Sequence, residues 1–124
     1  MTTTTATTTD LRERVEDLNR MILEGRAMEA FEKYYADDVV MWEDAENPCR
    51  GKEANRKREE EFFAKVTEFR GAEVKAVALG EDVSMVEWHF DYTHADWGDM
   101  NYDQVAVQRW RDGRIVDERF YKLG

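Results

Sequence analysis

The feature that most constrains the fold is a strict alternation of side chains over residues 83–93. From Val86 onward every second residue is large and apolar, and the residues between them are polar. The apolar set comprises Val86, Trp88, Phe90 and Tyr92. Because neighbouring side chains of a strand point to opposite faces of a sheet, this pattern predicts a strand with one buried and one solvated face.

The rest of the C-terminal half supplies partners for that strand. Residues 73–79 alternate weakly, and residues 102–111 show a second strand pattern. Asp112-Gly113 is typical of a two-residue hairpin turn, and residues 114–122 follow it as a last strand. We therefore expect an antiparallel meander in this half of the chain.

The N-terminal half has the periodicity of helices. An apolar stripe recurs at spacings of four, three and four residues; it consists of Leu11, Val15, Leu18 and Ile22. It predicts a helix that begins at Asp10 and ends at Gly25. Two more helices are expected over residues 27–35 and 51–67, with a short strand at 39–42. Helices followed by an antiparallel sheet indicate an α+β fold.

Composition narrows the class of protein. The length of 124 residues suits a single domain over residues 10–124, and the Thr-rich residues 1–9 favour a disordered tail. Cys49 is the only cysteine, which fits a reducing cytoplasm. The net charge of −10 would repel nucleic acids and anionic membranes, and no apolar run reaches the roughly 20 residues that span a bilayer. We expect a cytoplasmic protein that binds neither nucleic acids nor membranes.

Three strings carry a family resemblance. Residues 35–43 (YADDVVMWE) are similar to a helix-to-strand passage, residues 50–54 (RGKEA) to the start of a third helix, and residues 109–116 (RWRDGRIV) to a final hairpin. Together they resemble the nuclear-transport-factor-two-like superfamily, near the SnoaL-like polyketide cyclases and the ketosteroid isomerases. The likeness covers nearly everything after the Thr-rich tail.

The resemblance implies a cystatin-like cone, in which three N-terminal helices pack on a curved antiparallel sheet and enclose a pocket for a small organic ligand. Cyclases and isomerases of this group work there by general acid–base chemistry, without metal or cofactor. Other members have no known chemistry, so a fold of this kind does not fix a function. A non-catalytic module that binds a ligand or a partner protein is the alternative.

The resemblance also selects the strand faces that line the pocket. The ligand-binding set that it implies comprises Trp42, Trp88, Phe90, Tyr92, Gln104, Gln108, Trp110 and Phe120, with Val116 and Glu118 on the same face of the last strand. Large aromatic side chains usually fill cores, so ordinary core packing is the alternative for each of them.

Three residues are candidates for proton transfer. Glu43 falls where the isomerases have their carboxylate base, and aromatic surroundings would raise its pKa. Glu118 on the last strand and Asn19 on the first helix are the candidate partners. A solvated Glu43 at a strand end is the alternative interpretation. The isomerases' tyrosine donor falls on Asn19 and the cyclases' aspartate on Phe120, so neither known site is intact.

Two further groups have open interpretations. Arg58 falls where the isomerases have a pocket phenylalanine, and it could pair with Glu43 or Glu118, receive an acidic ligand, or pair with its helical neighbours. An acidic hairpin invites a metal interpretation; it contains His94, Asp96, Asp99 and Asp103. Their spacing matches no established motif, so we expect no metal.

The outer sheet face predicts a homodimer. Val83, Met85, Val105 and Val107 form an apolar centre that charged side chains surround, as in an interface core and rim. Light scattering at micromolar concentration should give twice the monomer mass of 14.7 kDa. A mass near that of the monomer would contradict the prediction.

Overall fold

The computed structural model describes residues 8–123, so the predicted disorder of residues 1–7 lies outside it. The first helix begins at Thr8, two residues before its predicted start at Asp10. The elements in chain order are α1 (Thr8–Leu23), α2 (Ala27–Tyr34), β1 (Tyr35–Trp42), β2 (Pro48–Arg50), α3 (Lys52–Ala64), β3 (Val66–Leu79), β4 (Val83–His94), β5 (Gly98–Arg111) and β6 (Arg114–Leu123).

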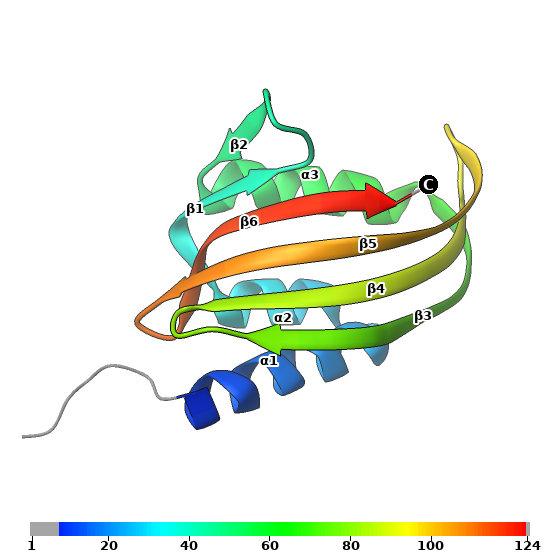
Figure 1. Cartoon of the computed structure of the whole chain (residues 1–124). Helices are drawn as coiled ribbons and strands as arrows, with labels where there is room; N and C mark the ends of the chain where they lie inside the picture. Colours follow the sequence, from blue (N-terminus) through cyan, green and yellow to red (C-terminus); the bar gives the residue numbers. More distant parts are fainter. Residues whose placement is uncertain (1–7, 124) are drawn as a thin grey trace, which may run out of the picture.

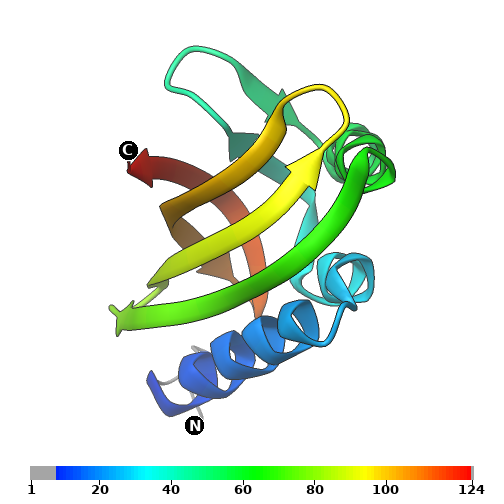
Figure 2. The same ribbon diagram turned by 90° about the vertical axis from the view of Figure 1, so that its right-hand side faces the viewer.

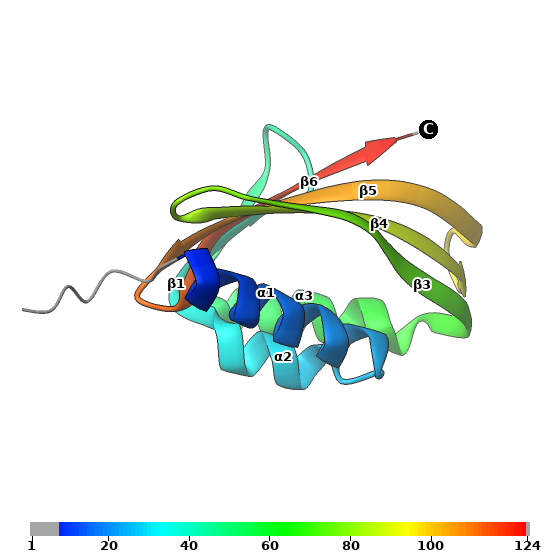
Figure 3. The same cartoon turned by 60° about the horizontal axis from the view of Figure 1, so that its bottom comes forward.

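Two layers make up the molecule (Figure 1). The six strands form one sheet in the order β2-β1-β6-β5-β4-β3. The sheet curves (Figure 2), and all three helices lie under the same face of it (Figure 3). The α+β prediction is confirmed. The sheet is mixed rather than antiparallel, because β1 pairs with β6 in parallel. Most of the chain separates these two strands, so no hairpin turn dictates their relative direction.

The alternation over residues 83–93 gives the facing that we predicted. Val86, Trp88 and Tyr92 are at most 3% exposed and lie under the sheet, whereas Met85 on the other face is 44% exposed. The antiparallel neighbours of β4 continue the buried face, since Val86 pairs with Ala106 and Trp88 with Gln104. This concave face and the helices enclose the core.

The predicted hairpin turn is present between β5 and β6. Asp112 and Gly113 have φ angles of 54° and 80°, the left-handed pair that a type I′ turn requires. The register then shifts, because Arg109 pairs with Asp117 whereas Trp110 pairs with Ile115. Val116 is the extra residue of this bulge, and fully buried Ile115 takes the inward position that we predicted for Val116.

The apolar stripe of α1 packs against the core, with Val15 and Leu18 fully buried. The helix ends at Leu23, and Gly25, two residues later, has a left-handed φ of 82°. The N–H of Gly25 donates to the carbonyl of Ile22, and the N–H of Arg26 donates to that of Met21 over 2.8 Å. These two bonds form a Schellman cap, which explains why the sequence locates this end well.

The third helix ends earlier than predicted. It stops at Ala64, and β3 starts at Val66, within the segment predicted to be helical. Its start is held by Asn55, whose Nδ2 donates to the carbonyls of Cys49 and Gly51 over 2.9 and 2.8 Å. The anchor ties α3 to β2, a strand in a segment predicted to be loop.

The outer sheet face presents the apolar centre on which the homodimer prediction rests. Met85 pairs with Val107, and Glu87 pairs with Val105, across β4 and β5. Within residues 8–123, no helix combines the length and the apolarity that crossing a membrane requires.

A substitution at Leu18 tests the packing of the core. Replacing this fully buried side chain by Ala should lower the free energy of unfolding by roughly 2–5 kcal/mol, because it removes apolar contacts and leaves a cavity. Leu23→Ala on the same helix is the matched control: its side chain is 47% exposed, so the change should stay within roughly 0.5 kcal/mol. Urea denaturation measures both, and equal effects would contradict the packing.

Candidate functional site

A carboxyl group is buried at the centre of the concave sheet face. Glu118 on β6 is 2% exposed, and both of its oxygens accept hydrogen bonds. The Tyr35 hydroxyl donates to Oε1 over 2.6 Å, and Gln108 Nε2 donates to Oε2 over 2.8 Å. Tyr35 stands at the start of β1 and Gln108 directly opposite Glu118 on β5, so three strands position one carboxyl.

The hydrogen bonds continue away from Glu118 into the core. Gln108 Oε1 accepts from the Ser84 hydroxyl over 2.7 Å, and Ser84 Oγ accepts from Trp110 Nε1 over 2.9 Å. Because the indole can only donate, it fixes the direction of each bond in the chain. Gln108 is therefore held with its amide nitrogen toward Glu118.

Burial raises the pKa of Glu118 from 4.5 to about 7, against the opposing effect of the bonds from Tyr35 and Gln108. The negative charges of Glu59 and Glu43 raise it further. Near neutral pH this carboxyl therefore exists in both protonation states, as a group that moves a proton must.

Tyr35 determines where a proton on Glu118 can lie. The protonated carboxyl needs an acceptor, and the Gln108 NH₂ group offers none. The Tyr35 hydroxyl can accept as well as donate, so without a bound ligand the proton of the neutral carboxyl lies on Oε1, toward Tyr35. Burial first, and then the charge of Glu118, raise the pKa of Tyr35 well above 10, so the phenol keeps its own proton.

A second carboxyl with a raised pKa comes from α3. Burial, followed by the charge of Glu43, raises the pKa of Glu59 from 4.5 to about 7, while Arg58 opposes the shift. Glu59 is half-buried and makes no hydrogen bond or ion pair with any residue in the described part of the chain. Its charge acts on both Glu118 and Tyr35. Helix and sheet thus each contribute a carboxyl to one electrostatic cluster.

The environment of Glu43 differs from the one that we predicted. It follows the end of β1 and is exposed, so the expected desolvation of its carboxyl is wrong. The chain turns into a solvated loop directly after Trp42, which leaves nothing to cover it. Its charge nevertheless raises the pKa of Glu59 and Glu118. Exposed Glu43, half-buried Glu59 and buried Glu118 therefore form a series of interacting carboxyls that starts at the surface.

Aromatic side chains adjoin this cluster. The hydroxyls of Tyr92 and Tyr102 are 2.9 Å apart, and burial followed by other effects, including the charge of Glu43, raises the pKa of each phenol. Trp88 stacks on half-buried Phe90 with ring centroids 5.3 Å apart. Of the predicted lining residues, Trp88, Trp110, Phe90 and Phe120 belong to or pack against the hydrophobic core. Gln108 joins the Glu118 network, and Gln104 is half-buried opposite Trp88.

Trp42 lies on the other face of the sheet. Its neighbour Met41 pairs with Glu118 on the concave side, so Trp42 and its partner Arg119 point outward. The indole Nε1 donates to Asp117, and the Arg119 guanidinium lies 4.5 Å from the ring centroid. The predicted pocket position of Trp42 is therefore wrong.

Arg58 and Asn19 are placed by the two outer helices. Arg58 is half-buried on α3, and its Nη2 donates to Asn55 Oδ1 over 3.1 Å, the pairing with helical neighbours that we considered. Asn19 on α1 is 6% exposed. Its Oδ1 is buried without a hydrogen-bond partner among the described residues, so it remains available as an acceptor.

The residues of the acidic hairpin contact other side chains of the protein. His94 stacks on Trp97 with centroids 3.8 Å apart, Asp96 pairs with Lys65, and Asp103 pairs with His89 and Lys75. No arrangement of His, Cys, Asp and Glu in residues 8–123 has the geometry of metal ligands.

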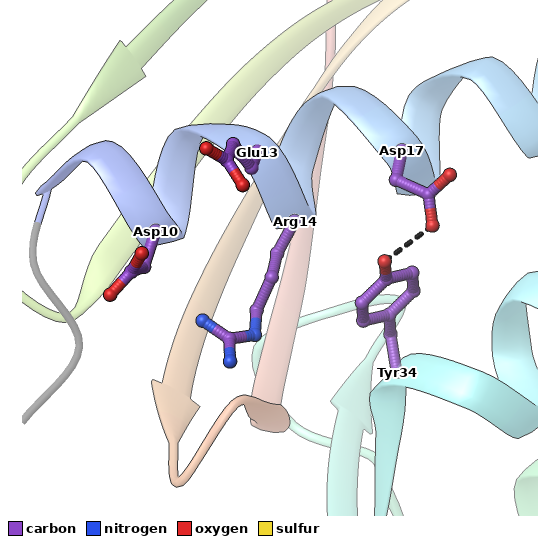
Figure 4. A pocket seen from close by; sticks show the side chains of 5 residues that line it. All are labelled: Asp10, Glu13, Arg14, Asp17 and Tyr34. Carbon is purple, nitrogen blue, oxygen red and sulfur yellow. Dashed lines mark hydrogen bonds between the residues drawn. The ribbon is translucent and has the colours of Figure 1, made fainter. Parts of the chain in front are cut away.

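An open groove of about 320 Å³ lies beside α1, where Asp17 faces Tyr34 at the end of α2 (Figure 4). Asp10, Glu13, Arg14, Asp17 and Tyr34 line it. Hydrogen bonds from Tyr34 and then Lys33 lower the pKa of Asp17. The groove has a fully ionised acid that already has partners, whereas Glu118 and Glu59 titrate near neutrality. We therefore assign the candidate site to the concave face.

Sequence reasoning missed Tyr35, Ser84 and a role for Glu59. Ser84 continues the alternation of Val86 and Trp88, and Glu59 shares a helix side with Phe62, so both inward positions had a signal. No sequence signal placed Tyr35 at the site, because its position depends on the parallel pairing of β1 with β6.

Comparison with known proteins agrees with this architecture. The sequence profile named "SnoaL-like domain" matches residues 15–118. A candidate SnoaL-like polyketide cyclase from Mesorhizobium loti is 29% identical, with a TM-score of 0.81, over 90% of this chain and 97% of its own. A second such candidate, from Jannaschia sp., is 13% identical over 90% of this chain and 85% of its own, with a TM-score of 0.75.

A protein of ketosteroid isomerase-like fold from Catenulispora acidiphila, solved with trimethylamine, is 14% identical over 76% of this chain and 73% of its own, with a TM-score of 0.64. No match was found among curated protein sequences.

The raised pKa of Glu118 makes stability depend on pH. The folded protein holds this proton up to about pH 7, whereas the unfolded chain releases it near 4.5. The contribution is fully present below 4.5 and is lost as pH rises through 7, a decrease on the order of 3 kcal/mol. Denaturation of Glu118→Gln across this range should show a shallower decline than the wild type. Glu61→Gln, an exposed change on α3, is the control, and parallel curves for all three proteins would contradict the assignment.

Proposed function

Because the chain belongs to the SnoaL-like domain family, we propose that it is a cofactor-independent acid–base catalyst that acts on a small organic molecule. The observation that carries the proposal is the buried carboxyl of Glu118, whose pKa is raised to about 7 on the concave sheet face. A carboxyl in this state transfers protons in both directions at neutral pH.

In the proposed reaction, Glu118 is the proton carrier. Its carboxylate removes a proton from a carbon next to a carbonyl group, and the electrons of the C–H bond form the enolate. The protonated Glu118 then returns the proton to that carbon of the enolate or, when the enolate is conjugated with a double bond, to its γ-carbon. Each oxygen of Glu118 keeps a free lone pair besides the bond from Tyr35 or Gln108, so these two residues orient the carboxyl without blocking it.

Glu59 and Asn19 support the reaction from the helices. Glu59 interacts electrostatically with Glu118 and titrates in the same range, so its ionisation raises the proton affinity of Glu118. Asn19 supplies an unpaired acceptor to the interior. These roles replace the one that the sequence indicated for Glu43, whose exposed carboxylate instead acts on the cluster from the surface.

Exchange of carbon-bound hydrogen tests the proposal without knowledge of the natural substrate. A panel of small enolisable ketones is incubated with the protein in D₂O near neutral pD, and NMR follows the loss of the α-proton signals. The wild type should accelerate exchange for at least one member. Glu118→Gln should reduce that acceleration at least about a hundredfold, because the proton carrier is gone.

The exposed variant Glu61→Gln is the matched control and should exchange at the wild-type rate. If the wild type does not accelerate exchange in any panel member, the acid–base proposal fails, and the non-catalytic binding module becomes the better description. An unchanged rate in Glu118→Gln would assign the proton transfer to another group.

A further inference from the structure

Three buried polar side chains lie in one row across the concave face of the sheet. Ser84 on β4 pairs with Gln108 on β5, and Gln108 pairs with Glu118 on β6. All three are at most 2% exposed. The hydrogen bonds follow the row, because the Ser84 hydroxyl donates to Gln108 Oε1 over 2.7 Å and Gln108 Nε2 donates to Glu118 Oε2 over 2.8 Å. One amide therefore connects the serine hydroxyl to the buried carboxyl.

The two hydrogen-bond partners of Glu118 differ in what they offer to its two protonation states. The Tyr35 hydroxyl suits both states, because it can donate to a carboxylate and accept from a protonated carboxyl. A primary amide suits one state at a time, since its NH₂ group can only donate and its carbonyl oxygen can only accept. Which end of Gln108 faces Glu118 therefore decides which protonation state the amide stabilises.

The amide of Gln108 has the orientation that stabilises the carboxylate. If the amide turned over, its oxygen would face Glu118 and its NH₂ group would face Ser84. The hydrogen of the Ser84 hydroxyl would then lose its acceptor, and within residues 8–123 this hydroxyl donates to no other group. An unpaired donor at a fully buried position is strongly unfavourable, so the hydroxyl holds the amide as it is.

Trp110 fixes the direction of the serine hydroxyl. The indole Nε1 donates to Ser84 Oγ over 2.9 Å, so the hydroxyl hydrogen points away from the indole and toward Gln108. Trp110 is 6% exposed and is held on two sides. Its backbone N–H donates to the carbonyl of Asp82 over 2.9 Å, and the ring of Tyr34 packs edge-on against it with centroids 6.0 Å apart.

We propose that Ser84 is a positioning residue for the proton carrier: by holding the NH₂ group of Gln108 toward Glu118, it keeps the buried carboxyl able to lose its proton and act as the base. The inference rests on the proposed function, because it names the residue that prepares Glu118 for that reaction. Ser84 contacts the far end of the amide, so its effect on Glu118 passes through Gln108.

Ser84→Ala removes the hydroxyl and leaves the rest of the row in place. Gln108 Oε1 then has no donor, so the amide gains by turning this oxygen toward a protonated Glu118. The pKa of Glu118 should rise by about one unit, the shift expected when the charged form loses one hydrogen bond. An unchanged pKa would overturn the proposal.

NMR of the ¹³C-labelled carboxyl groups measures this titration directly. Glu118 and Glu59 both titrate near neutral pH, so the spectra of Glu118→Gln and Glu59→Gln assign the two signals. The other groups that act on Glu118 are Tyr35 on β1 and Glu43 after it, and both are retained in every Ser84 variant. A difference between Ser84 variants therefore reports the change at this serine.

Ser84→Thr is the matched control. It also changes the packing at this fully buried position, but it retains a hydroxyl that can donate to Gln108. The pKa of Glu118 should therefore stay close to its wild-type value. A rise as large as that in Ser84→Ala would assign the effect to packing and overturn the proposal.

A double-mutant cycle tests whether Ser84 acts through the amide. Gln108→Met has a side chain of similar length without an amide, so the serine hydroxyl has nothing to orient in that background. Ser84→Ala should raise the pKa of Glu118 in the wild-type background and leave it unchanged in Gln108→Met. Equal shifts in both backgrounds would show that the hydroxyl acts on Glu118 without the amide, which contradicts the positioning role.

Positioning and catalysis fail separately in these experiments. For a ketone whose exchange the wild type accelerates, Ser84→Ala should move the rise of the pH–rate profile to higher pH by the same amount as the titration, because the base is the ionised carboxyl. A profile that does not move would overturn the positioning role alone. A shifted titration of Glu118 in a protein that exchanges no ketone would support the control of Glu118 by Ser84 and contradict the acid–base proposal.

Discussion

The parallel pairing of β1 with β6 joins the two halves of the molecule, and the site depends on it. β1 continues directly from α2 and lies just before β2 and α3, whereas β6 is the last strand of the meander. The register places Met41 beside Glu118, and it brings the hydroxyl of Tyr35 within 2.6 Å of that carboxyl. The same pairing holds α3 under the sheet, so that Glu59 acts electrostatically on Glu118. Without it, the helices and the meander would each have an unpaired apolar face.

Burying a carboxyl group lowers the stability of the fold, and the surrounding hydrogen-bond network reduces that loss. Glu118 accepts two hydrogen bonds, and the chain through Ser84 to Trp110 satisfies every polar atom behind it. Burial nevertheless dominates, and the pKa stays near 7. The fold thus retains a carboxyl that is poorly suited to stability at neutral pH and well suited to proton transfer. Such a compromise is characteristic of functional sites, where burial and neighbouring charges shift the pKa values of the residues.

The departures from the cyclase pattern follow from the geometry of a strand. The position that resembles the cyclases' aspartate holds Phe120, and the carboxyl stands two residues earlier, at Glu118. A shift of two residues keeps a side chain on the same sheet face and moves it about 7 Å along the strand. Phe120 packs against the hydrophobic core. Glu118 therefore lies on the same sheet face as Phe120, beside Tyr35 and Gln108, and three strands support its carboxyl.

The sequence by itself determined several features that depend on near neighbours in the chain. Alternation in β4 gave the buried face, Gly25 gave the end of α1, and Asp112-Gly113 gave the last turn, because side-chain direction and left-handed backbone are local properties. Alternation placed Glu118 and Gln108 each on one face of its strand, and the family resemblance indicated that this face is the inward one. Tertiary structure alone decided that Glu43 is exposed and Trp42 faces outward, and that Tyr35 meets Glu118 across 83 residues. A pKa depends on solvent exclusion and on charges from other elements, and these exist only when helix and sheet have packed together.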